Sequence, residues 1–105
     1  MRILSVFLLA HFLPCVAVAQ NSISGRIDYM GSCNYAAIAT RNGYTIALWM
    51  GGWLPVTGQV LSGEVERLGM IVVNYDNGRD GSFFVENVYL TASSAQQALA
   101  ERDCQ

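Results

Sequence analysis

The chain has 105 residues, of which 52% are hydrophobic and only 13% are charged, and its formal net charge is −2. Its basic residues are six arginines with no lysine, and its charges are scattered rather than clustered. A nucleic-acid-binding protein needs a basic stripe that neutralises phosphates, so the composition argues against nucleic acid as a partner. Attraction to an anionic membrane surface is disfavoured for the same reason.

The first nineteen residues have the pattern of an export signal. Arg2 precedes an apolar run over residues 3–13, and residues 17–19 (Ala-Val-Ala) offer the small-x-small pattern of a signal peptidase site. The apolar run is too short to span a bilayer, which needs about 20 such residues. We therefore predict a cleaved signal peptide over 1–19, a single small domain over 20–105, and no membrane span. The expected location is the periplasm of a bacterium or the exterior of the cell.

Cleavage of the signal would also change the number of cysteines from three to two. Cys15 would leave with the signal, and Cys33 and Cys104 would remain as a pair in an oxidising compartment, which predicts a disulfide. A metal-binding thiol pair lacks support, because there is no CxxC spacing and the only histidine, His11, lies in the signal. In a lipoprotein Cys15 would instead be acylated, but Pro14 fits poorly before the cut.

The first half of the predicted domain reads as three strands, over residues 23–30, 34–41 and 44–50. Gly25 is expected to mark a bulge or a bend in the first strand. Asn42-Gly43 predicts a hairpin with a type I′ turn, because both residues accept positive φ. The strand period of two places two sets on opposite faces of the third strand: Thr45, Ala47 and Trp49 on one, and Tyr44, Ile46, Leu48 and Met50 on the other.

The second half begins with a loop over residues 51–58, where three glycines and a proline bar regular structure. A fourth strand is predicted over 60–68, interrupted or bent at Gly63. A fifth, over 69–75, is so apolar that we expect it to be buried on both faces. A polar turn over 76–81 leads into a sixth strand over 82–90.

A helix is predicted after the strands, over residues 94–102. Ser93 with Gln96 has the spacing of a capping box, and the residues that follow are good helix formers. The least polar stripe of this helix consists of Ala95, Ala98, Leu99 and Arg102. Cys104 follows the helix, so the predicted disulfide would pin the helix to the start of the second strand.

Six short strands with tight turns predict an all-β fold, an OB-like closed or half-open barrel with one short C-terminal helix pinned by a disulfide. Residues 58–65, followed by Gly69 and residues 71–73, resemble the opening of the OB-type barrel of ribosomal RNA-binding repeats. The resemblance implies an OB-like barrel. RNA binding is not carried over, because a whole hairpin precedes this segment here and the basic RNA-binding face is absent.

Catalytic groups are scarce in the predicted mature chain. It has no histidine, no lysine and no unpaired thiol, so we predict that it is not an enzyme and needs no cofactor. Carboxylates leave one alternative, a small hydrolase: Glu64 and Glu66 lie two apart on a predicted strand and would face the same side. Glu86 lies among apolar residues, where either a raised pKa or an ion pair is possible. We expect the ion pair, with Arg26, Arg41 or Arg67.

The polar turn at 76–81 superficially resembles a calcium loop. Asp76 and Asp80 would be the first and third ligands, but Gly78 stands where the second belongs and Asn87 where a bidentate glutamate is needed. Turn chemistry explains the same residues, since Asp, Asn and Gly tolerate left-handed conformations. We therefore predict no metal site.

Three aromatic residues form the candidate binding site: Tyr44, Trp49 and Trp53. A tryptophan on a glycine-rich loop can enter a partner's pocket or stack on a sugar ring. In the structural alternative, Trp53 plugs the end of the barrel and Trp49 packs beneath the helix.

These features together predict an exported, non-enzymatic binding module that acts on a protein partner or an envelope component. An inhibitor of a hydrolase is one concrete form, because a small barrel pinned by a disulfide presents rigid loops at low entropic cost. The alternative is an oligosaccharide-binding OB-like barrel that uses Trp49 and Trp53 as stacking platforms. A carboxylate-dependent hydrolase is the third possibility.

Overall fold

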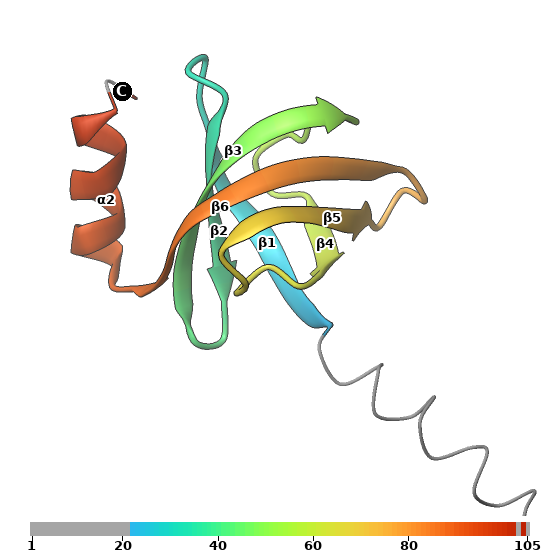
Figure 1. Ribbon diagram of the computed structural model, residues 1–105, viewed down its shortest axis with the longest axis horizontal. Coiled ribbons are helices and arrows are strands. Elements are labelled where there is room, and N and C mark those ends of the chain that lie inside the picture. Colours follow the sequence, from blue (N-terminus) through green and yellow to red (C-terminus); the bar gives the residue numbers. More distant parts are fainter. Residues whose placement is uncertain (1–21, 103, 105) are drawn as a thin grey trace, which may run out of the picture.

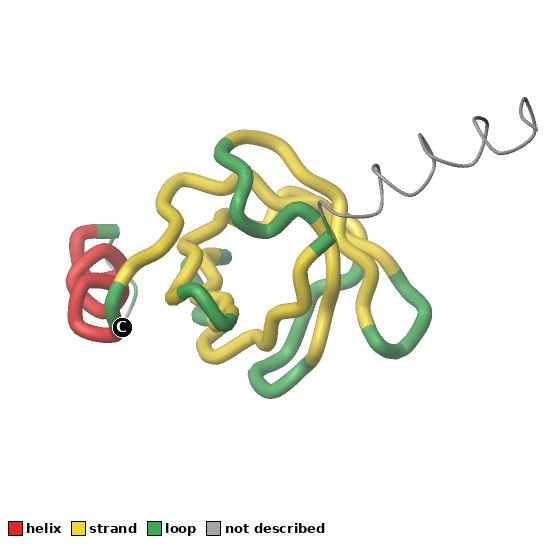
Figure 2. The backbone as a smooth tube through the Cα atoms, turned by 90° about the horizontal axis from the view of Figure 1, so that it is seen from below, coloured by secondary structure: helices red, strands yellow, loops and turns green. Residues whose placement is uncertain are grey.

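The computed structural model of the protein describes residues 22–102 and residue 104, so the predicted signal peptide and its Cys15 lie outside the described residues. The strands form one closed antiparallel barrel with a short helix at its side, which confirms the predicted fold class (Figures 1 and 2). The elements are β1 (Ile23–Met30), β2 (Tyr35–Thr40), β3 (Gly43–Gly52), β4 (Val60–Gly63), β5 (Gly69–Tyr75), β6 (Asp80–Leu90) and α2 (Ala92–Glu101).

The barrel consists of two three-stranded meanders, β1-β2-β3 and β4-β5-β6. The strand order around the barrel is β1-β2-β3-β6-β5-β4, and β4 pairs with β1 to close it. Because β3 and β4 are not neighbours, the loop over residues 53–59 must cross one end of the barrel. Its far end is fixed to β1, where the amide of Gly58 donates to the carbonyl of Ile27 (2.7 Å) and the amide of Ile27 donates to the carbonyl of Gln59 (2.8 Å).

Alternation along the strands fills the barrel interior. The two sets of β3 residues lie on opposite faces, as predicted. Thr45 and Ala47 are buried and Trp49 packs against the core, whereas the intervening residues face the outside of the barrel. The turn over residues 64–68 closes the end opposite the crossing loop, where the hydroxyl of Thr45 donates to the carbonyl of Val65 (3.0 Å). The interior core consists of Ile27, Ala36, Ile38, Ala47, Leu61, Val65, Ile71, Val73, Tyr75, Phe83 and Val85.

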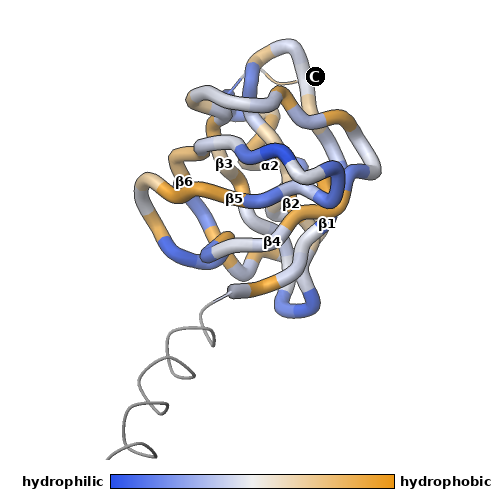
Figure 3. The backbone as a smooth tube through the Cα atoms, turned by 90° about the vertical axis from the view of Figure 1, so that its right-hand side faces the viewer, coloured by the Kyte–Doolittle hydropathy of each residue, from blue (hydrophilic) through white to orange (hydrophobic). Residues whose placement is uncertain are grey.

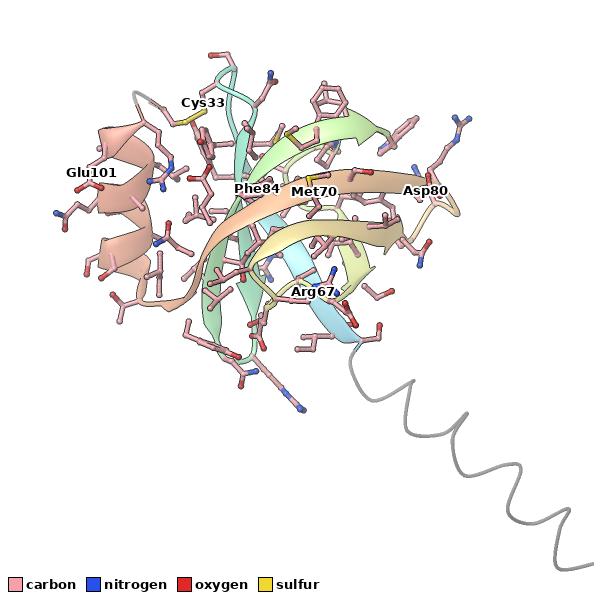
Figure 4. All side chains as sticks on the ribbon, in the orientation of Figure 1. Cys33, Arg67, Met70, Asp80, Phe84 and Glu101 are labelled. Carbon is pink, nitrogen blue, oxygen red and sulfur yellow. A yellow bond between two sulfur atoms is a disulfide. The ribbon has the colours of Figure 1, made fainter. Side chains whose placement is uncertain are left out.

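The helix α2 packs on the outer face of the barrel wall and forms a second hydrophobic cluster there. Ala95, Ala98 and Leu99, three members of the predicted stripe, are buried against Ala37 and Ile46 of β2 and β3. The predicted disulfide is confirmed: Cys33 and Cys104 are bonded, with their Cα atoms 5.6 Å apart, beside the end of α2 (Figure 4). No helix in the described part of the chain has the length and apolar character to cross a membrane.

The N-terminus of α2 differs from the prediction by two residues. Thr91 is the N-cap, and its hydroxyl accepts a hydrogen bond from the amide of Ser94 (3.2 Å). The predicted capping box on Ser93 is therefore wrong. Thr91 and Ser93 are both hydroxyl residues followed by helix formers, so the local sequence fits either of them as the N-cap. Because β6 ends at Leu90, the helix can begin directly after Thr91.

The strand register shifts once between β1 and β2 and three times between β3 and β6, and two of these irregularities shape the barrel wall. The register of β1 against β2 shifts between Ile27 and Tyr29, so the predicted irregularity exists but does not lie at Gly25. Gly25 is needed for close packing, since a Cβ there would lie 2.7 Å from the Cγ2 of Ile38. In β6 an extra residue bulges between Asn87 and Leu90, and the exposed Tyr89 adopts φ 61°. This bulge bends the chain away from the barrel toward α2.

The β2–β3 hairpin turns one residue earlier than predicted. Thr40 pairs with Gly43, so Arg41 and Asn42 are the turn residues, and of this stretch only Gly43 has positive φ (130°). The type I′ turn on Asn42-Gly43 is therefore wrong. The hydroxyl of Thr40 accepts from the amide of Asn42 (3.0 Å), which stabilises the observed turn.

Candidate functional site

Trp53, on the loop that crosses the barrel end, is partly exposed and firmly held. The residue is 37% exposed, and its indole Nε1 donates to the Oε1 of Gln59 (3.2 Å). The guanidinium of Arg79 lies over the indole ring, 5.1 Å from its centroid. The carbonyl of Trp53 accepts from the Nε1 of Trp49 and from the hydroxyl of Tyr75, each at 3.2 Å. One ring face is thus already covered, and the loop is tied to side chains of the interior.

The three predicted aromatic residues do not form one cluster. Trp49 is half-buried and is hydrogen-bonded to the carbonyl of Trp53. It packs against the barrel core rather than beneath α2. Tyr44 lies at the other end of β3, next to the hairpin turn, where it packs against the helix cluster. Its hydroxyl donates to the carboxylate of Asp28 (3.1 Å), and this hydrogen bond raises the pKa of Tyr44. The structure therefore brings Trp49 and Trp53 together and leaves Tyr44 apart.

A larger exposed apolar surface lies on the outside of β3, β6 and β5 and includes Leu68, in the turn just before β5; we call it the apolar wall. Its rows follow the strand register, in which Leu48 pairs with Phe84 and Phe84 pairs with Met70. Phe84 and Met70 lie side by side in Figure 4, and Figure 3 shows the hydrophobic course of β5 and β6. The exposed members are Met50 (53%), Leu68 (62%), Met70 (50%), Val72 (63%) and Phe84 (41%).

The wall corrects the prediction for the fifth strand. Residues 69–75 were expected to be buried on both faces, but β5 alternates between buried and exposed residues. Ile71, Val73 and Tyr75 face the interior, whereas Met70 and Val72 face outward. An apolar run carries no alternation that would distinguish a strand covered on both faces from one covered on a single face.

The carboxylates of the hydrolase alternative hold the barrel end together. Glu64 and Glu66 lie after the end of β4, in the turn over residues 64–68, and not on a common strand as predicted. Glu64 pairs with Arg67 (2.8 Å). Glu66 accepts from the hydroxyl of Thr40 (2.7 Å) and from the side-chain Nδ2 of Asn42 (3.0 Å), and so ties this turn to the β2–β3 hairpin.

Glu86 forms the expected ion pair, but with a partner that was not predicted. Its carboxylate accepts from two nitrogens of Arg102, at 2.7 and 2.9 Å, instead of pairing with Arg26, Arg41 or Arg67. The hydroxyl of Tyr35 also donates to Glu86 (2.8 Å), and this hydrogen bond raises the pKa of Tyr35. Arg102 lies over the ring of Tyr35 (5.2 Å), so the half-buried cluster anchors the end of α2.

The turn over residues 76–79 has the geometry of an ordinary polar turn. The side-chain oxygen of Asn77 accepts from the amide of Arg79 (2.9 Å), which is an Asx-type hydrogen bond. Among the residues that the structure describes, no group of three metal-ligating side chains comes together. Comparison of the chain with protein-family models, with curated proteins and with solved structures finds no match.

Proposed function

We propose that the protein is an exported, non-enzymatic binding module that captures a protein partner through the apolar wall. The observation that carries this proposal is the wall itself. Five large apolar residues are each 41–63% exposed with no formal charge among them: four lie on the adjacent strands β3, β6 and β5, and Leu68 lies in the turn just before β5. The disulfide is consistent with a protein that works in an oxidising compartment.

The size of the wall supports a protein partner. Its five residues expose roughly 500 Å², which is within the range of about 300–600 Å² for the largest apolar patch of a typical monomer, and such a patch is often functional. A standard interface buries about 800 Å² per partner, so the wall would supply the apolar centre and its polar surroundings the rim. Met50 and Met70 lie on the wall, and flexible methionines adapt to the shape of a partner.

The chemistry of the wall also specifies the kind of partner. Because none of the five side chains carries a charge, a strongly charged partner surface would lose its hydration there without gaining an ion pair. The wall therefore favours a partner that presents an uncharged apolar face, such as one side of an amphipathic helix. The Trp53 loop supports this role less well, because Arg79 and Gln59 already engage its indole.

Cross-linking with matched variants tests the proposal. A photoreactive residue at position 84 should trap a partner protein in the exporting cell, and Met70→Glu should reduce the yield at least tenfold. Val56→Glu is the matched control, because Val56 is also exposed (62%, against 50% for Met70) but lies on the loop that crosses the barrel end. The melting temperatures of both variants should match that of the parent. A partner retained by Met70→Glu, or no partner above its background, would overturn the proposal.

Export itself has a separate measurement. The intact mass of protein recovered outside the cytoplasm should correspond to a chain that begins at Gln20 and carries no lipid. A chain that begins at Cys15 and carries the mass of an acyl group would instead identify an anchored lipoprotein.

A further inference from the structure

A groove of about 420 Å³ lies beside the contact between α2 and the wall of the barrel, on the side of β1, and its lining shares no residue with the apolar wall. Grooves that bind small molecules have volumes of about 300–1,000 Å³. The groove is lined by Asp28 and Tyr29 of β1, Ala37 of β2, Tyr44 of β3, Ala92, Ala95, Gln96, Leu99 and Ala100 of α2, and Cys104.

The groove exists because small residues meet where larger ones would close the gap. The floor is Ala37, and α2 presents Ala92, Ala95 and Ala100 toward it. The disulfide at Cys104 and the ion pair of Arg102 with Glu86 fix the end of the helix, so the position of α2 on the barrel is set without a ligand. The groove is therefore preformed, and a ligand would not have to order it.

The polar side chains that line the groove are the carboxylate of Asp28, the hydroxyls of Tyr29 and Tyr44 and the amide of Gln96. Arg26 donates to the Oδ1 of Asp28 (2.9 Å), and this hydrogen bond lowers the pKa of Asp28, so the carboxylate is ionised at neutral pH. The hydroxyl of Tyr44 donates to the Oδ2 (3.1 Å), which leaves the phenolic oxygen free to accept. Arg26 itself does not line the groove, and Asp28 is the one charged residue that does.

We propose that this groove binds a small molecule that consists of an apolar body and a primary ammonium group. The apolar body would lie on Ala37 and Leu99, between the rings of Tyr29 and Tyr44. The ammonium group, which has three donors and no acceptor, would meet the carboxylate of Asp28 and the phenolic oxygen of Tyr44. An anionic ligand of the same shape would face Asp28 with no compensating cation in the lining.

Titration of isotope-labelled protein with three probes of one shape tests this inference: 4-phenylbutylamine, 4-phenylbutanol and 4-phenylbutyrate. The amine should shift the amide resonances of the groove and bind at least tenfold more tightly than the carboxylate. Asp28→Asn should weaken the amine at least tenfold and leave the alcohol within twofold. Asp28 is on the surface, so the variant should remain folded, as its amide spectrum will report.

A second pair of variants tests the location. Ala100 and Gln97 are both exposed on α2, but only Ala100 lines the groove. Ala100→Phe should fill the groove and abolish binding of the amine, whereas Gln97→Phe should leave it unchanged. Equal affinities for the amine and the carboxylate would overturn the proposal. Undiminished binding to Ala100→Phe, or resonance shifts confined to the apolar wall, would do the same.

Discussion

Replacement of Trp53 by alanine separates a structural role of the crossing loop from a role in recognition. The residue is 37% exposed, so nearly two thirds of it is buried. At about 25 cal/mol per Å², a buried area of roughly 150 Å² contributes about 4 kcal/mol, and this is an upper estimate because unfolded chains are partly compact. We therefore expect Trp53→Ala to lower the free energy of unfolding by about 3 kcal/mol.

The measurement is urea unfolding followed by circular dichroism, together with partner capture by the folded variant. If the apolar wall carries recognition, Trp53→Ala should capture the partner as well as the parent does. Arg79→Ala is the control for the stacked guanidinium and should cost only about 0.5–1 kcal/mol. A loss of less than about 1 kcal/mol in stability, combined with a tenfold loss of capture, would refute this reasoning and make the loop the recognition element.

Three other changes test the covalent and polar features of the fold. Joint replacement of Cys33 and Cys104 by serine should lower the free energy of unfolding by about 4 kcal/mol in the chain-entropy model, because the bridge spans a sequence separation of 71; a loss below about 1 kcal/mol in urea would contradict that model. Tyr29→Phe should leave the melting temperature unchanged or raise it, because this buried hydroxyl has no hydrogen-bond partner among the described residues; a clear decrease would reveal a partner. Burial raises the pKa of Tyr75 to about 12 from its ordinary 10.0. The folded state therefore holds this proton more tightly than the unfolded state, and stability should fall as the pH rises from 10 to 12; Tyr75→Phe should flatten this decline, and an equally steep decline in the variant would assign it to other groups.

The sequence predicted the bounds of a strand correctly where glycine or polar turn residues stand at both of its ends. β1 and β5 have the predicted bounds, because glycine and polar turns delimit both strands in the sequence. β4 is shorter than predicted: it ends at Gly63, which has φ 156°, and the turn that follows buries Val65 in the barrel end. The burial of Val65 in this turn depends on contacts with distant strands, and strand propensity does not include such contacts.

The parts of the candidate site that escaped prediction depend on contacts between distant segments. The partner of Glu86 is Arg102, which reaches it only because the bulge at Tyr89 directs α2 back along the barrel. The apolar wall escaped prediction because Met70 and Val72 are as apolar as the interior residues that alternate with them. Which face of β5 turns inward follows from its register with β6, and the sequence of β5 alone does not contain that information.

The closed barrel also limits how this protein can recognise other chains. Each of the six described strands pairs with two neighbours over part of its length, so only short strand segments, such as residues 86–90 of β6, have a single partner. Recognition by the closed part of the barrel then depends on side chains. Outward residues such as Phe84 and Val72 contribute little to the interior core, so their replacement can change the choice of partner without loss of the fold. A barrel of this kind is therefore a scaffold on which specificity can evolve separately from stability.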